Sequence, residues 1–176
     1  FPSQKLNLES MSPSLTYLNV VSGEAIDQAL MPKSFQQLSI RHISEANDGS
    51  IWFGGQYEGY LKDKVPLFGR HVRSQEIEFI QEDAAVYQEM NQYVGSVVGS
   101  HDRSLIATTG PRGGLVLIWD TVKLKLISKR SIPDVCGAAP FDHDFFFSDG
   151  CGNLWCENTK ISKRNNVGWD NHLKKV

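Results

Sequence analysis

The stretch GGLVLIWDTVKLKLISK, residues 113–129, reads as two β-strands joined by a short polar turn. Its first strand is apolar and ends at Trp119-Asp120, and its second alternates apolar and polar residues. A strand that ends in Trp-Asp and is followed by a hairpin partner is typical of a WD-type repeat. Because a single dipeptide often arises by chance, the interpretation depends on whether the pattern recurs in the chain.

The pattern recurs three times. Residues 14–28, SLTYLNVVSGEAIDQ, align with it so that Asn19 lies over Asp120. Weaker copies are PLFGRHVRSQEIEFI at residues 66–80 and GNLWCENTKISK at residues 152–163. Each copy reads as strand, turn, strand, so the chain is built from repeated hairpins.

A second pair of strands precedes the last three copies. Its turns lie at residues 47–49 (Asn-Asp-Gly), 101–103 and 142–144. One complete unit therefore contains four short strands at a period of about 40–50 residues, the spacing expected of propeller blades. Residues 82–90, EDAAVYQEM, interrupt this pattern and predict a short helix between two blades.

We therefore expect an all-β fold, a single β-propeller domain over residues 1–176 with about three complete four-stranded blades plus part of a fourth. The predicted blades are residues 1–35 (partial), 36–90, 91–133 and 134–176. The first begins with its two outer strands, and the last lacks a clear fourth strand. An open ring exposes strand edges, so we expect the missing N-terminal half or a partner chain to complete the propeller.

Composition excludes several functional classes. The chain has 40% hydrophobic and 22% charged residues and a net charge of -2, without the basic excess of a nucleic-acid-binding protein. Its apolar runs are too short to span a bilayer. Cys136, Cys151 and Cys156 are too few for a disulfide scaffold and lack C-x-x-C spacing. The favoured interpretation is that these cysteines are small buried residues. The alternative, in an exported protein, is that two of them form a disulfide.

Candidate ligand residues lie where a propeller binds its partners, in the channel and at the loops of one face. Arg41 and His42 lie on a predicted inner strand, LSIRHI, where alternation directs them to different faces. They provide either a channel-lining ligand group or a histidine hydrogen-bonded between blades, and the second interpretation is favoured.

A second group of candidates lies on the loops of two blades. Gln56, Tyr57 and Glu58 follow the strand SIWFGG and should reach a rim, where the glutamate binds a cation, accepts a proton or fixes the loop. Arg112, in GPRGG, occupies the equivalent position one blade later and either holds a carboxylate or phosphate or stays solvated on a tight hairpin. The equivalence also allows an ion pair between Glu58 and Arg112.

Asp170 and His172, in WDNHL, are weak metal candidates. Two residues apart on an expected strand, they point to one side, but a metal site needs at least a third ligand. No catalytic constellation is found: YVGSVVGS lacks the G-x-S-x-G elbow, and GPRGG lacks the lysine and spacing of a P-loop. No catalytic residue or cofactor is therefore assigned, and a non-enzymatic role is favoured.

The stretches that join the repeats carry a family resemblance. Taken in order, these stretches resemble an exported bacterial family, the domain-of-unknown-function family fifteen-thirteen. They are QKLNLESMSPSLTYL, LSIRHI, QYEG, NQYVGSV, GPRGG, CGAAP and WDNHL. The resemblance covers essentially the whole chain and aligns it with the C-terminal half of that family. The chain departs from the family in lacking the N-terminal blades and in QYEGYLKDKVPL, where the family has smaller or acidic residues after the glutamate.

The resemblance has implications for architecture and cellular setting. It implies a seven-bladed propeller, similar in shape to the quinoprotein amine dehydrogenase β chain, exported to the periplasm by a twin-arginine signal. It also implies an association with iron acquisition, because genes of this family lie beside those for imelysin-type iron-uptake proteins and di-haem proteins.

Two functions are therefore expected. The first is a non-enzymatic exported binding or scaffold module that docks a periplasmic iron-uptake or haem protein. The alternative is a metal-binding or redox-accessory propeller that works with such a partner. A metal site requires at least three of His42, Glu58, Asp170 and His172 to converge, whereas a docking module requires only an exposed apolar or aromatic patch.

Overall fold

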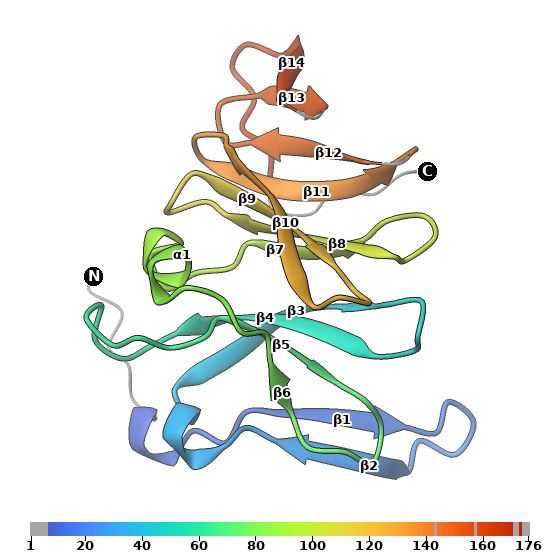
Figure 1. Ribbon diagram of the computed structural model, residues 1–176. Helices are drawn as coiled ribbons and strands as arrows, with labels where there is room; N and C mark the ends of the chain where they lie inside the picture. Colours follow the sequence, from blue (N-terminus) through green and yellow to red (C-terminus); the bar gives the residue numbers. More distant parts are fainter. Residues whose placement is uncertain (1–6, 143, 157, 171–172, 174–176) are drawn as a thin grey trace.

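The computed structural model describes residues 7–142, 144–156, 158–170 and 173. These residues form four antiparallel sheets stacked in chain order, with little helix (Figure 1). The strands are β1 (Ser14–Leu18), β2 (Ala25–Leu30), β3 (Leu38–Glu45), β4 (Ile51–Tyr57), β5 (Phe68–His71), β6 (Glu78–Phe79), β7 (Ser96–Gly99), β8 (Leu105–Gly110), β9 (Leu115–Asp120), β10 (Lys125–Ser131), β11 (Val135–Phe141), β12 (Asp144–Asp149), β13 (Asn153–Cys156) and β14 (Thr159–Lys163). The helical segments are η1 (Leu8–Ser10), η2 (Lys33–Phe35) and α1 (Ala84–Glu89).

Each four-stranded sheet is a simple meander. Strands β3 to β6, β7 to β10 and β11 to β14 pair in sequence order, whereas β1 and β2 form a two-stranded sheet. The first strands of successive four-stranded sheets, β3, β7 and β11, lie next to one another, so the sheets pack around a common inner side. This is the arrangement of propeller blades, and the predicted all-β propeller is confirmed.

The last blade differs from the sequence expectation. Strand β14 pairs with β13 and gives this blade a fourth strand, so the prediction of a blade without a clear fourth strand was wrong. All five residues of β14 are exposed, so no buried face marks this strand, although the hairpin copy at residues 152–163 includes it. Backbone pairing with β13 defines it instead.

Strand β9, which ends in the Trp-Asp dipeptide, is buried on both faces. Leu115, Leu117 and Trp119 belong to a core that extends back to the first blade. Val116 and Ile118 belong to a second core, shared with the last blade. Because successive side chains of a strand point to opposite faces, one strand serves both cores.

The Trp-Asp dipeptide has two structural roles. The indole Nε1 of Trp119 donates a hydrogen bond to Oγ1 of Thr108 on β8 at 3.0 Å. Oδ1 of Asp120 accepts hydrogen bonds from the backbone N–H groups two and three residues ahead, at 3.0 and 2.8 Å, and so closes the turn into β10. In the first blade, Asn19 makes the same two bonds at 2.8 and 3.0 Å, which confirms its alignment with Asp120.

Helix α1 lies between the second and third blades, as predicted. The side chain of Asp83 accepts a hydrogen bond from the backbone N–H of Ala85 at 2.9 Å and caps the helix. Tyr87 is buried against Phe68, with ring centroids 5.6 Å apart, and its hydroxyl donates to the carbonyl of Ile80. The helix is thereby fixed to the second blade.

The cysteines do not occupy the expected positions. Cys136 and Cys156 are half-buried and Cys151 is exposed, so the prediction of small buried core residues was wrong. Cys151 lies in the turn between β12 and β13, where its short side chain meets solvent. None of the three described cysteines is in a disulfide. Within the described ranges, no helix combines the length and apolar character needed to cross a membrane.

Candidate functional site

Most of the candidate residues gather at one end of the sheets. The loop between β4 and β5 (residues 58–67), helix α1 and the turn between β8 and β9 (residues 111–114) all lie at this end, on the left in Figure 1. We call this end the rim. It contains Gln56, Tyr57, Glu58 and Arg112, and Arg41 reaches it through an ion pair.

A bulge in β3 places Arg41. Ile40 pairs with Gly55 and His42 pairs with Gly54, so Arg41 is an extra residue without a direct partner on β4. The strict alternation expected for Arg41 and His42 was therefore wrong at this point. The Arg41 side chain is 48% exposed, while His42 is half-buried.

Glu58 is held at the rim by its side chain and its backbone. A carboxylate oxygen of Glu58 lies 3.6 Å from a guanidinium nitrogen of Arg41, and the Glu58 side chain is only 12% exposed. Its backbone N–H donates to the carbonyl of Gln37 at 3.0 Å. The ion pair between Glu58 and Arg41 thus lies within one blade. The sequence had allowed an ion pair between blades, from Glu58 to Arg112.

Gln56 and Tyr57 lie within β4 and not after it, because β4 pairs with β3 as far as Leu38 opposite Tyr57. The Tyr57 hydroxyl donates to Oδ2 of Asp63 at 2.9 Å, and the same oxygen accepts the backbone N–H of Tyr60 at 3.2 Å. Burial, together with this hydrogen bond and the charge of Asp63, raises the pKa of Tyr57 to about 12. The phenol therefore stays neutral and clamps the loop at neutral pH.

The loop is also tied to the next blade. The side-chain amide of Gln92 donates to the carbonyl of Tyr60 at 2.6 Å, and the carbonyl of Gln92 accepts the backbone N–H of Tyr57 at 3.0 Å. Gln56 forms an isolated antiparallel bridge with Tyr93. These contacts join β4, its loop and the segment after α1 into one hydrogen-bonded unit.

Arg112 continues this unit. Its guanidinium lies over the ring of Tyr93, 4.9 Å from the centroid, as in a cation–π contact. Its carbonyl accepts a hydrogen bond from the side-chain amide of Asn91 at 2.9 Å. The adjacent Gly113 lies so close to the carbonyl of Glu89 that no Cβ would fit.

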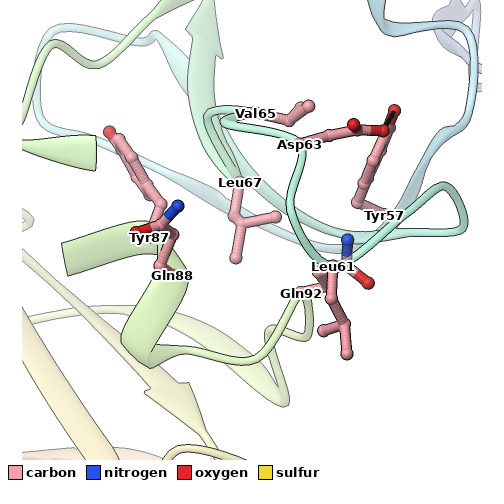
Figure 2. Close-up of a pocket in the computed structure, with 8 residues that line it drawn as sticks. All are labelled: Tyr57, Leu61, Asp63, Val65, Leu67, Tyr87, Gln88 and Gln92. Carbon is pink, nitrogen blue, oxygen red and sulfur yellow. Dashed lines mark hydrogen bonds between the residues drawn. The ribbon is translucent and has the colours of Figure 1, made fainter. Parts of the chain in front are cut away.

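A small cavity lies beneath the loop, between it and α1 (Figure 2). Its volume accommodates about one water molecule, far less than a ligand pocket requires. The lining residues are Tyr57, Leu61, Asp63, Val65, Leu67, Tyr87, Gln88 and Gln92. This cavity is therefore too small to be a substrate site.

The metal candidates do not form a described site. Asp170 and His172 were expected to lie on one strand. Asp170 instead follows the last strand, so this expectation was wrong for Asp170. His172 lies outside the described residues. Within the described chain, no group of three His, Cys, Asp or Glu side chains is placed to hold a metal ion. Burial, with the charges of Asp134, Asp149 and Asp170, raises the pKa of Cys136 to about 11, which keeps its thiol protonated.

Sequence reasoning overlooked the tip of the β4–β5 loop. Tyr60 and Leu61 are 75% and 68% exposed, the most prominent apolar side chains of the rim. An available signal was the apolar pair within the polar stretch QYEGYLKDKVPL, which also departs from the family pattern.

Comparisons with known proteins agree with the propeller geometry. Residues 1–176 match the profile of a family described as "Protein of unknown function (DUF1513)". No curated protein matches the sequence. Among solved structures, the chain is similar to the Dos1 propeller, with a TM-score of 0.59 and 11% identity over 87% of this chain and 42% of that chain.

A second solved structure, of a mitotic checkpoint complex, contains a chain with a TM-score of 0.54 and 13% identity. The match covers 97% of this chain and 47% of that one. At these identities the similarity shows the fold alone. The chain spans less than half the length of each of these two solved chains.

Proposed function

The chain belongs to the DUF1513 family of proteins of unknown function, and we propose that it is a non-catalytic propeller module that docks a protein partner through its rim. The observation that carries this proposal is the hydrogen-bonded loop that displays Tyr60 and Leu61 to solvent. Aromatic side chains on preorganised loops are common anchors of protein interfaces, because little conformational entropy is lost when they bind.

The polar groups of the rim support docking over catalysis. Glu58 is paired with Arg41, Asp63 accepts hydrogen bonds from the loop, and Arg112 stacks on Tyr93. These side chains are engaged in holding the rim together. A catalytic acid or base would instead need access to a bound substrate.

We place this docking in the periplasm, with a partner from iron acquisition such as an iron-uptake or haem protein. This setting rests on the resemblance of the joining stretches to an exported family. A seven-bladed ring for the intact propeller rests on the same resemblance.

Site-specific photo-crosslinking tests the docking function. A benzoylphenylalanine is placed at Leu61 and, as a matched control, at Val122, which is 76% exposed at the other end of β9. We expect the probe at position 61, and not the probe at position 122, to form one covalent adduct of defined mass with the partner protein. We expect Tyr60→Ala to reduce the yield of this adduct severalfold. Equal labelling at both positions, or none at position 61, would overturn the proposal.

A further inference from the structure

We infer that a β-hairpin from another part of the propeller completes the first blade, by pairing with the free edge of β1 and covering Ile43 on β3. The two strands described for this blade, β1 and β2, form its outer half and are held on the second blade. The Tyr17 hydroxyl lies 2.8 Å from Nδ1 of His71 on β5, and Asp27 on β2 accepts the backbone N–H of Ser74 at 2.7 Å. The surface involved does not include the β4–β5 loop, so the inference is independent of docking at the rim.

The inner edge of β1 has no partner strand among the described residues. Asn19 aligns β1 with β9, because both strands end in the same turn closed by a side chain. In the three complete blades, the strands at this position, β5, β9 and β13, each pair on both edges. The carbonyl of Pro13 accepts the N–H of Met31, so by alternation the backbone N–H and C=O groups of Ser14 and Thr16 point away from β2. These groups are therefore available to a further antiparallel strand.

Ile43 shows what the same half of the blade leaves uncovered. It pairs with Phe53 on β4, on the face of the second blade that carries His71 and contacts β1, and it is 58% exposed. Residues that face the preceding blade from the next two inner strands are buried. Val97 on β7 is 5% exposed against β4, and Ala138 on β11 is 2% exposed against β8. The repeat therefore indicates the cover for Ile43, which is the inner strand pair of a preceding blade.

The inner hairpins of the complete blades specify the chemistry of the occupant. Their second strands, β4, β8 and β12, are six or seven residues long, are largely buried and carry no charged side chain in their interiors. Because β3, β7 and β11 lie next to one another on the inner side, a hairpin beside β1 continues this series and becomes part of the ring. The occupant is therefore a largely apolar hairpin of the propeller, with its second strand antiparallel to β1.

The experiment is an NMR titration of the isotope-labelled 176-residue chain with a blocked peptide of residues 94–110, its own β7–β8 hairpin, as the probe. We expect the peptide to shift the methyl resonances of Ile43 and to slow hydrogen exchange of the Thr16 amide. The same peptide with Ala107→Pro should bind about tenfold more weakly, because proline cannot donate to the ladder from the middle of a strand. In the protein, Ile43→Ser should weaken the unmodified peptide by about tenfold, since less apolar area becomes buried. Val122→Ser, a matched change of an exposed aliphatic residue, should leave the affinity unchanged.

Several outcomes would overturn the inference. They are the absence of binding, equal binding of the two peptides, insensitivity to Ile43→Ser, or shifts that avoid β1 and β3. Protection of the Thr16 amide that rises with protein concentration in the absence of peptide would also overturn it, because a second copy of the chain would then occupy the edge. Crosslinking at Leu61 reports on different residues, so a failure of docking at the rim and a failure of this inference are distinguished.

Discussion

Asp149, at the end of β12, provides a sharp test of the packing of the last blade. It is only 2% exposed and accepts four hydrogen bonds. Oδ1 accepts the backbone N–H groups of Cys151 and Asn153 at 2.9 and 3.0 Å. Oδ2 accepts the side-chain amide of Asn153 at 2.7 Å and the indole N–H of Trp155 at 2.8 Å. The carboxylate therefore satisfies both the backbone and the side-chain donors that close the turn into β13.

Asp149→Asn should be strongly destabilising, although it changes the shape of the side chain little. An amide has one oxygen and one NH₂ group, so in either orientation its NH₂ faces two donors and leaves them without an acceptor. Each unsatisfied buried donor costs about 1–3 kcal/mol, which gives a loss of about 2–6 kcal/mol. This is a large fraction of the roughly 5–15 kcal/mol typical of a folded domain.

The effect should depend on pH in a defined direction. Burial raises the pKa of Asp149, but the hydrogen bonds from Asn153, Trp155 and Cys151 outweigh it and hold the pKa below its usual value. Because the pKa is depressed in the folded state, the stabilisation is fully present above about pH 4. It is lost as the pH falls through the folded-state pKa. The stability difference between wild type and Asp149→Asn should therefore narrow in acid.

Urea unfolding followed by tryptophan fluorescence, from about pH 3 to pH 7, measures this difference. Asp102→Asn is the matched control, because Asp102 closes a turn between β7 and β8 with its carboxylate in solvent, where water replaces lost bonds. We expect a clearly smaller change from the control. The reasoning would be refuted if Asp149→Asn were as stable as wild type at neutral pH, or if its deficit grew in acid.

Single contacts elsewhere in the chain give three further predictions. Gly113→Ala should destabilise the protein and expose α1 to proteases, because its Cβ would overlap the carbonyl oxygen of Glu89; thermal unfolding and limited proteolysis measure this. Thr108→Val removes the acceptor of the Trp119 indole at nearly constant volume and should cost about 1–3 kcal/mol in urea unfolding, whereas a neutral result would show that the bond is dispensable. Tyr57→Phe should cost about 1 kcal/mol at mildly alkaline pH. Because the folded-state pKa is raised to about 12, that difference should decline only as the pH rises above about 10, which alkaline urea titrations would detect.

The repeated hairpins were predictable because their signals are local. Trp119-Asp120 and its counterpart Asn19 mark turns closed by a side chain onto the next few backbone groups, and such turns depend on nearby residues alone. The apolar run that ends at Trp119-Asp120 likewise indicated the strand that became β9, although its burial on both faces was not predicted. The short helix was predictable because residues 82–90 interrupt a regular strand pattern.

The features that were missed depend on pairing between distant segments. The bulge at Arg41 arises from the register of β3 on β4, which no local pattern in the sequence reveals. Strand β14 has no buried face and is defined by its pairing with β13. Tyr60, Gln92 and Arg112 come from three loops of two blades and meet at the rim. The composition of these loops gave no indication that they lie together.

The two faces of β9 have a consequence for how the molecule opens. A register slip of one residue would exchange every side chain of this strand between the two cores, so neither core can rearrange without disturbing the other. Fluctuations that begin at the exposed β14 should lose amplitude at this strand before they reach the rim. In hydrogen exchange, the amides of β9 should be among the slowest to exchange, with protection decreasing toward the first and last blades.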